Sequence, residues 1–250
     1  MKLSTVLFFC CSIVLTSLFN SCTKDDLDDF SGTSGTFKDS RDDTEYVWLR
    51  IGDQIWMGEN LAYLPSVSPP AEGSQTDPYY YVYDYQGSSV SEARATDNFS
   101  TYGVLYNWQA AVASCPDGWH LPDDNEWEEL ENYLGDNGYN YDGTTGGGRD
   151  KIAKSMGSTS VWTSSSNTGS VGNTDYPEYR NKSDFTALPG GARTNSGSFL
   201  HTGKYGLWWS ATTDGTTGNP WARVISYDLV DVYRGLHYKV NGFSLRCVRD

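Results

Sequence analysis

One stretch of the chain concentrates residues that often carry chemistry. Residues 115–134 read CPDGWHLPDDNEWEELENYL, which places a cysteine and a histidine beside a run of carboxylates. Cys115 and His120 have the side chains of a thiol nucleophile and its general base. However, an oxidised cysteine cannot attack a substrate, and His120 stands between two apolar residues of an expected short strand. We therefore predict a structural role for His120 and no catalytic residues.

The N-terminus has the composition of an export signal. Lys2 precedes an apolar run, residues 3–19, that is too short and too one-sided for a membrane span. Ser21 comes directly before Cys22, as at a bacterial lipoprotein processing site. We predict a signal peptide over residues 1–21 and lipidation of Cys22. Ordinary secretion with cleavage nearby is the alternative.

An acidic segment of flexible composition follows the predicted lipid site. Residues 23–29 (TKDDLDD) resemble the export signal that sends lipoproteins of Bacteroidetes-type bacteria to the outer cell surface. A solvated acidic linker is the alternative, and residues 31–35 (SGTSG) are flexible by composition. We therefore predict a tether over residues 22–44. The protein would be anchored in the outer membrane by lipid and would face the cell exterior.

The cysteine count predicts one disulfide. Of five cysteines, Cys10 and Cys11 leave with the signal and Cys22 takes lipid, so Cys115 and Cys247 remain. Two remaining cysteines in an exported protein are by default bonded to each other. In the chain-entropy model, closing a loop of roughly 130 residues contributes up to about 4–5 kcal/mol.

Metal ligands are sparse in the sequence. Residues 136–143 (DNGYNYDG) alternate aspartate and asparagine in the manner of a calcium loop, but they lack the glutamate that closes an EF-hand. We predict no cofactor and no metal ligands, with a structural calcium ion as the alternative. His201 and His237 stand alone in loop-like contexts, where we expect surface residues.

Closely spaced aromatic residues indicate the candidate ligand-binding site. The tyrosines of YYYVYDYQG recur at period two, so they would share one face of a strand. Aromatic faces stack on sugar rings, and a neighbouring carboxylate accepts hydrogen bonds from sugar hydroxyls. The candidate site comprises Tyr79, Tyr81, Tyr83, Asp84 and Tyr85, with Trp221 as a second wall. The alternative is that these rings fill the core, which is the interpretation we prefer for Trp208 and Trp209.

Composition limits the architecture and the partners. The 250 residues suffice for one large domain or two small ones, and 9 Trp, 18 Tyr and 9 Phe can build a core. The 26 glycines favour turns over long helices. A net charge of −14 argues against sequence-independent nucleic-acid binding, which needs clustered Lys and Arg.

Local patterns predict the helices and strands around residues 115–134. Strands are expected at residues 47–51 and 54–57, a helix at 104–113, a strand at 119–121, and short glycine-punctuated strands in the last third. The helix at 104–113 would bury Leu105, Trp108 and Val112. A second helix would begin at the N-cap Asp123, with Glu126 completing a capping box, and would end at Gly135. It would bury Trp127, Leu130 and Leu134 and expose Glu128, Glu129 and Glu131.

Seven segments occur in the order found in one known family. They are DQIWMGENLAYLP, TYGVLYNWQAA, CPDGWHLPDDNEWEEL, KIAKSM, FTALPGGAR, YGLWWSAT and GFSLRCVRD. Residues 45–250, which contain them, resemble the Fibrobacter succinogenes major paralogous domain. The resemblance implies an α+β fold similar to C-type lectins and formylglycine-generating enzymes, with two helices packed on small irregular antiparallel sheets and long loops. It also implies a bridge from Cys115 to Cys247.

The resemblance and the residues together favour a binding protein. Formylglycine-generating relatives need two reactive cysteines late in the chain, and only Cys247 lies there; the Glu-Pro-Asn and Trp-Asn-Asp triplets of calcium-dependent lectins are missing as well. We expect a non-catalytic surface lipoprotein that binds a glycan or a protein. A structural or adhesive surface component without a small ligand is the alternative, and an enzyme of unknown activity is the third.

Overall fold

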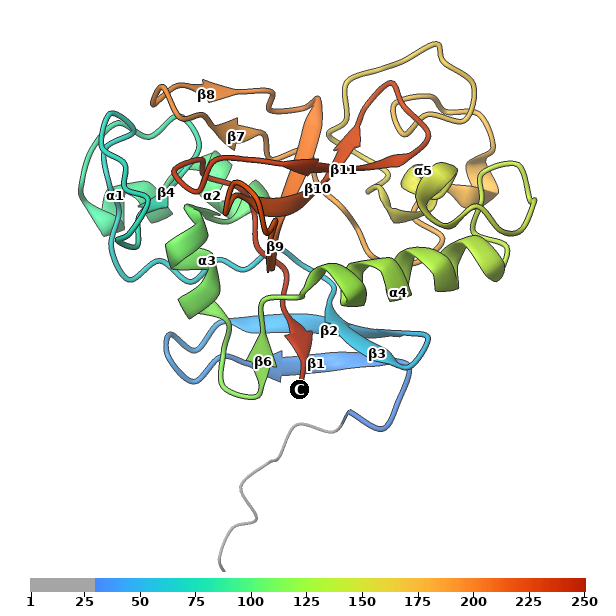
Figure 1. The fold of residues 1–250 in the computed structure, drawn as a ribbon, viewed down its shortest axis with the longest axis horizontal. Coiled ribbons are helices and arrows are strands. Elements are labelled where there is room, and N and C mark those ends of the chain that lie inside the picture. Colours follow the sequence, from blue (N-terminus) through green and yellow to red (C-terminus); the bar gives the residue numbers. More distant parts are fainter. Residues whose placement is uncertain (1–29) are drawn as a thin grey trace, which may run out of the picture.

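The computed structural model describes residues 30–250, so the predicted signal peptide, Cys22 and the first part of the tether lie outside the described residues. The fold is α+β, with small, irregular antiparallel sheets and long loops (Figure 1). The helices of the described part are α1 Val90–Arg94, α2 Asp97–Tyr102, α3 Trp108–Ser114, α4 Asp124–Asp136 and α5 Ala153–Met156, with 3-10 helices η1 Gly148–Asp150 and η2 Pro177–Tyr179. None of them is long and apolar enough to cross a membrane.

The strands form four sheets in the described part of the chain. A five-stranded sheet has the order β1-β2-β3-β12-β6, and a three-stranded sheet has the order β11-β10-β9. Two-stranded sheets pair β4 with β5 and β7 with β8. The strands are β1 Ser34–Lys38, β2 Glu45–Ile51, β3 Gln54–Met57, β4 Tyr80–Tyr81, β5 Leu105–Tyr106, β6 Trp119–His120, β7 Ala192–Arg193, β8 Phe199–Leu200, β9 Tyr205–Thr213, β10 Pro220–Ser226, β11 Val232–Leu236 and β12 Val248–Arg249.

The five-stranded sheet joins the two ends of the described chain. The predicted strands at 47–51 and 54–57 are confirmed as β2 and β3, which pair across a turn where Gly52 has a φ of +61°. The C-terminal strand β12 lies between β3 and β6. In Figure 1 this sheet forms one end of the molecule, and the β7–β8 hairpin lies at the other end.

The predicted tether is shorter than residues 22–44. Residues 34–38 form β1, which pairs with β2 from Ser34 opposite Leu49 to Lys38 opposite Glu45. The ring of Phe30 lies 5.2 Å from that of Trp48, so the fold includes this residue too. The prediction from composition fails here because the backbone of β1 pairs with β2 while Phe30 and Phe37 supply apolar contacts.

Helix α4 has its predicted start and buried stripe. Asp123 Oδ1 accepts from the Glu126 backbone N–H at 2.8 Å, and Glu126 Oε2 accepts from the Asp123 N–H at 2.7 Å, which confirms the capping box. Trp127, Leu130 and Leu134 are buried as predicted. Gly135 lies inside the helix rather than ending it. A glycine suits this position because a Cβ would come within 2.8 Å of the Gly148 carbonyl.

The helix predicted at 104–113 is partly wrong. Leu105 and Tyr106 form β5, and α3 begins only at Trp108, after the N-cap Asn107. The Asn107 side chain accepts from the Ala110 N–H at 3.0 Å, which fixes this start. Val112 is half exposed, so the expected buried stripe is not formed as predicted.

A disulfide links the end of α3 to the C-terminal segment. Cys115 and Cys247 are bonded, with their Cα atoms 5.9 Å apart, as predicted. Trp208 and Trp209 on β9 are buried, also as predicted. The described chain contains five α-helices rather than two, although α4 is the longest, and the likeness to C-type lectins stays a prediction.

Candidate ligand-binding cavity

The tyrosines of the predicted ligand site do not share one strand face. Strand β4 contains only Tyr80 and Tyr81, and Asp84 has a φ of +63° that turns the chain. Tyr81 is completely buried: its hydroxyl donates to the Glu72 carbonyl at 2.8 Å, and the Arg193 guanidinium lies 4.8 Å from its ring centre. The period-two interpretation is therefore wrong, and Tyr81 is core.

The other predicted ligand residues lie in separate surroundings. Tyr79 stacks on the buried Tyr81, with ring centres 6.3 Å apart, and Tyr83 packs at 5.2 Å from Phe199 of β8. The Tyr85 hydroxyl donates to Glu92 at 2.9 Å, which holds it against α1. Asp84 is exposed. Trp221 belongs to β10, in a different sheet, and the Arg234 guanidinium lies 3.3 Å from its ring centre.

In the segment considered as an alternative calcium loop, residues 136–143, a carboxylate pairs with a lysine of the chain. Lys151 Nζ lies 2.7 Å from Asp142 Oδ2, and the Asp142 carboxylate also accepts from Thr144. The hydrogen bond from Lys151 lowers the pKa of Asp142 to about 2. Within residues 30–250, no three His, Cys, Asp or Glu side chains are grouped so that they could hold a metal ion.

His120 joins the start of α4 to the C-terminus. Its Nε2 lies 2.7 Å from Glu126 Oε1, and its Nδ1 lies 2.5 Å from Asp250 Oδ1. Burial alone would lower the pKa of His120, but the hydrogen bonds with Glu126 and Asp250 outweigh it and raise the pKa. Because Cys115 is in a disulfide, it offers no thiol to this histidine.

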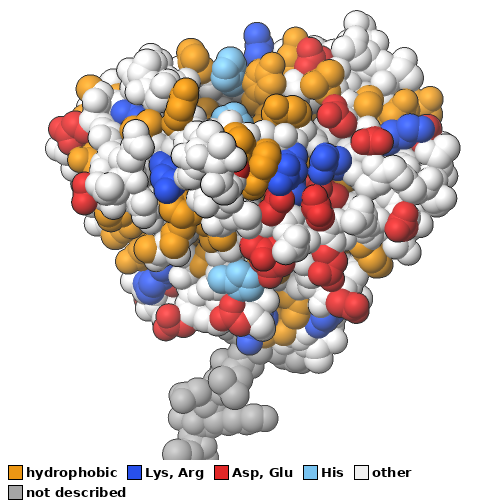
Figure 2. All heavy atoms as spheres, in the orientation of Figure 1, with side chains coloured by type: hydrophobic (Ala, Val, Ile, Leu, Met, Phe, Trp, Pro, Cys, Tyr) orange, Lys and Arg blue, Asp and Glu red, His pale blue; other side chains and the backbone are white. Residues whose placement is uncertain are grey.

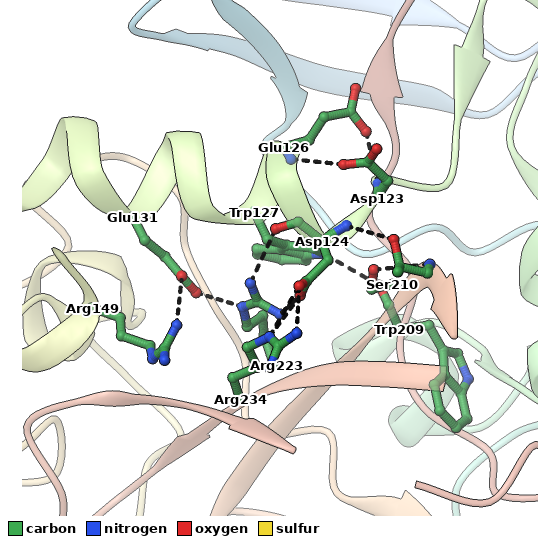
Figure 3. A network of polar contacts seen from close by, with 11 residues as sticks. Asp123, Asp124, Glu126, Trp127, Glu131, Arg149, Trp209, Ser210, Arg223 and Arg234 are labelled. Carbon is green, nitrogen blue, oxygen red and sulfur yellow. Dashed lines mark hydrogen bonds and ion pairs between the residues drawn. The ribbon is translucent and has the colours of Figure 1, made fainter. Parts of the chain in front are cut away.

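Buried charges gather between α4 and the three-stranded sheet. Arg223 Nε donates to Glu131 Oε1 at 2.6 Å, and its Nη1 donates to Asp124 Oδ1 at 2.7 Å. Arg234 Nη2 donates to Asp124 Oδ2 at 2.6 Å, and Arg149 lies 3.7 Å from Glu131 (Figure 3). We call this set the arginine–carboxylate network. Glu131, which was predicted to face water, is buried instead, and its ion pair with the buried Arg223 compensates for the loss of hydration.

The two carboxylates of the network respond differently to burial. Burial would raise the pKa of Asp124, but the hydrogen bonds from Arg234 and Arg223 outweigh it and lower the pKa. Glu131 is more deeply buried, and burial raises its pKa despite the attraction of Arg223. Every carboxylate here has a guanidinium partner, so the network has the character of a structural ion cluster.

A cavity lined mainly by aromatic and aliphatic side chains lies between the β7–β8 hairpin and the three-stranded sheet. Its volume is about 340 Å³, within the range of small-ligand sites. Figure 2 shows histidine side chains bordered by hydrophobic ones on the upper part of the face drawn. The lining residues are aromatic, aliphatic or uncharged polar: Ala192, Thr194, His201, Tyr205, Leu207, Val224, Tyr233, His237, Asn241 and Phe243.

The two histidines of the cavity differ in exposure. His237 is half buried, which corrects the expectation of a surface residue; its ring centre lies 5.0 Å from that of Phe243, edge to face. Burial lowers the pKa of His237, so its ring is neutral at pH 7. His201 is exposed as expected, and its φ of +76° is uncommon for a residue with a side chain. Its ring lies 4.8 Å from that of Tyr205.

Two buried polar atoms of the lining residues have no hydrogen-bond partner in the described chain. They are Nε2 of His237 and Oδ1 of Asn241. Leaving such an atom unsatisfied costs about 1–3 kcal/mol, so native proteins rarely do so without a reason. Both atoms are buried in the free protein, so a ligand in the cavity reaches them only where the side chains rotate toward it.

The sequence interpretation missed this cavity. Tyr205 and Leu207 alternate along β9 and so share a face, which is a detectable signal. The remaining lining residues come from segments between 192 and 243 that meet only in the fold. Tyr83 packs on Phe199, the partner of Arg193 in the β7–β8 hairpin, so the predicted tyrosines and the cavity contact the same hairpin.

Comparison with known proteins gives the family but no described relative. Searches of curated proteins and of solved structures found no significant match to the chain. Residues 49–249 match the family model of the Fibrobacter succinogenes major domain, and because the match covers most of the chain, the protein belongs to that family.

Proposed function

We propose that this protein is a non-catalytic carbohydrate-binding lipoprotein of the bacterial cell surface. The observation that carries the proposal is the cavity beside the β7–β8 hairpin, whose lining combines aromatic rings with unpartnered polar atoms. A sugar unit has one face rich in C–H groups and a rim of hydroxyls. Aromatic rings bind the C–H face, and uncharged polar side chains bind the hydroxyls.

The lining residues supply both kinds of contact. Tyr233 is 56% exposed, so a ligand at the mouth of the cavity can reach its ring. Tyr205 and His201 form an edge-to-face pair at the hairpin side of the same cavity. The Asn241 side chain has an unpartnered amide oxygen that can accept from a sugar hydroxyl. Affinity for one sugar unit would be weak, and many copies on a cell surface would strengthen it through avidity.

Glycan binding is tested with the mature domain on a glycan array, followed by calorimetry with the best sugar. Tyr205→Ala is expected to lower the affinity by about threefold to tenfold, the value of one stacking contact. Tyr238→Ala is the matched control, because Tyr238 is 57% exposed and does not line the cavity. Tyr83→Ala tests the earlier tyrosine site. Retention of full binding by Tyr205→Ala and its loss in Tyr83→Ala would move the site to that segment.

The anchoring part of the proposal depends on Cys22, which lies outside the described residues. The export-type signal, the small residue before Cys22 and the acidic segment after it support lipidation and display on the exterior of the outer membrane. Cys22→Ala is expected to release the protein from membranes, since stable attachment needs acyl chains. A variant that still incorporates labelled palmitate would contradict lipidation at this residue.

A protein ligand is the second candidate, because apolar side chains are exposed along an edge strand. Tyr233 and Leu236 of β11 and the following Tyr238 are all more than one-third exposed, and β11 is the edge of its sheet. Unpaired edge strands accept a further strand from a partner. A pull-down that is lost in Leu236→Ala and Tyr238→Ala but kept in Tyr205→Ala would favour this function. The same outcome without any glycan binding would also fit a purely adhesive role.

A further inference from the structure

We propose that the cavity selects uncharged sugar units and rejects anionic ones such as uronic acids, sialic acids and sugar phosphates. This inference rests on the proposed carbohydrate function and assigns its ligand class. Its first support is the lining itself. None of the ten described residues that line the cavity carries an Asp, Glu, Lys or Arg side chain.

The strands that build the cavity do carry cations, but these face away from it. Arg193 stands between Ala192 and Thr194, Arg223 precedes Val224, and Arg234 follows Tyr233. Successive side chains of a strand point to opposite faces of the sheet. Because the lining residues take the cavity face, their arginine neighbours take the other face.

Each of these arginines already binds protein acceptors there. Arg193 donates to the carbonyls of Pro70, Glu72 and Val240 at 2.6 to 3.0 Å. Arg223 and Arg234 both bind Asp124 in the arginine–carboxylate network. Turning Arg193 or Arg223 toward a ligand would break these bonds and leave buried acceptors unpaired, and turning Arg234 would break its paired hydrogen bonds with Asp124.

The lysines near the cavity are also directed elsewhere. Lys204, next to Tyr205, lies 6.0 Å from the ring centre of Tyr227, and Lys239 lies 4.6 Å from that of Trp108. His237 is neutral at pH 7 because burial lowers its pKa. An anionic ligand would therefore lose hydration without gaining a counter-ion, and the net charge of −14 would add repulsion at long range.

The unpartnered atoms favour the same ligand class. The amide oxygen of Asn241 is an acceptor, so it needs a donor from the ligand. A hydroxyl can donate to it and also bond with His237 Nε2, whose neutral ring can act in either role. The carboxylate or phosphate group of an anionic sugar only accepts, so this group would make no hydrogen bond with the amide oxygen, and only the sugar's hydroxyls could.

The test compares matched sugars on the mature domain by calorimetry: galactose with galacturonic acid, glucose with glucuronic acid, and glucose with glucose 6-phosphate. The neutral member of a pair is expected to bind at least about tenfold more tightly. Thr194→Lys places a cation on the lining and is expected to narrow that ratio. Asn195→Lys is the control, because it adds the same charge at the next, exposed residue outside the lining.

The outcomes separate the two proposals. Equal or tighter binding of the acidic members, weakened by Tyr205→Ala, would overturn the selectivity and keep carbohydrate binding. Absence of any sugar binding would overturn both. Choline is included as a probe, because an uncharged aromatic cavity also suits quaternary ammonium groups. Saturable choline binding in place of sugar binding would overturn the assignment of the ligand as a neutral sugar.

Discussion

The arginine–carboxylate network and the cavity are built from neighbouring residues of the same two strands, yet they have opposite chemistry. Arg223 and Arg234 of β10 and β11 serve the network, while Val224 and Tyr233 beside them line the cavity. In the network, each carboxylate has a guanidinium partner (Figure 3). In the cavity, no charge is present among the lining residues and two polar atoms lack partners.

The difference shows where binding can be sought in this fold. The cluster of Asp, Glu and Arg has the residue types of an active site, but its groups satisfy one another and hold α4 on the sheet. The cavity has few reactive groups, but it presents the exposed ring of Tyr233 and two polar atoms that the fold leaves without partners. Residues that stabilise and residues that bind should therefore respond oppositely to substitution.

The largest expected effect is on stability and comes from the network. Arg223→Met would leave Asp124 and Glu131 buried with weaker partners, which costs about 3–5 kcal/mol of the free energy of unfolding. Urea denaturation followed by circular dichroism measures this loss. Arg234→Met is the control and should cost clearly less, because its side chain is 24% exposed and Asp124 keeps Arg223. A loss below about 1 kcal/mol for Arg223→Met would show that the network is not structural.

A cavity substitution should reverse this pattern. Tyr233→Ala is expected to lower the affinity for a neutral sugar by about threefold to tenfold, the value of one stacking contact. Its stability should change by less than about 0.5 kcal/mol, because the side chain is 56% exposed. Calorimetry and urea denaturation of the same sample measure both quantities. A large loss of stability with unchanged affinity would place Tyr233 among the structural residues.

His237 provides a finer test, because it belongs to the cavity but is partly buried. His237→Phe keeps a ring against Phe243 and removes the unpartnered Nε2. We expect the free energy of unfolding to stay the same or rise by up to about 1 kcal/mol, while sugar affinity falls. A clear loss of stability would mean that Nε2 has a partner in the free protein, and the argument from unpartnered atoms would fail.

The same contrast explains what the sequence can predict. The capping box of Asp123 and Glu126 and the stripe of Trp127, Leu130 and Leu134 are local patterns, and α4 follows from them. The disulfide follows from a cysteine count. The burial of Glu131 does not, because its partner Arg223 is 92 residues away.

The ligand site depends still more on tertiary structure. Tyrosines at period two predict one strand face only if the strand is long enough, and β4 ends at Tyr81 because the chain turns at Asp84. His237 and Asn241 lie in a segment without a local signal, and they become lining residues only when it packs beside β9 and β10. Residue types alone therefore favoured the denser aromatic cluster over the cavity.

The smallest expected effect concerns pH and compares the two histidines directly. The pKa of His120 is raised above 6.5 by Glu126 and Asp250, despite the opposing effect of burial. Its contribution to stability should be complete below pH 6.5 and should be lost as the pH rises through the raised pKa. The pKa of His237 is lowered below 6.5 by burial, so stability should instead fall as the pH drops below 6.5.

Paired variants assign the two slopes of the free energy of unfolding against pH. His120→Gln should flatten the slope above pH 6.5, and His237→Phe should flatten the slope below it. The His120 effect should stay under about 1 kcal/mol, because its side chain is 41% exposed and solvent screens the ion pairs. Urea denaturation at half-unit steps from pH 5 to pH 9 resolves both windows. If His120→Gln altered only the slope below pH 6.5, His120 would not be the protonated group that contacts Glu126 and Asp250 in the folded protein.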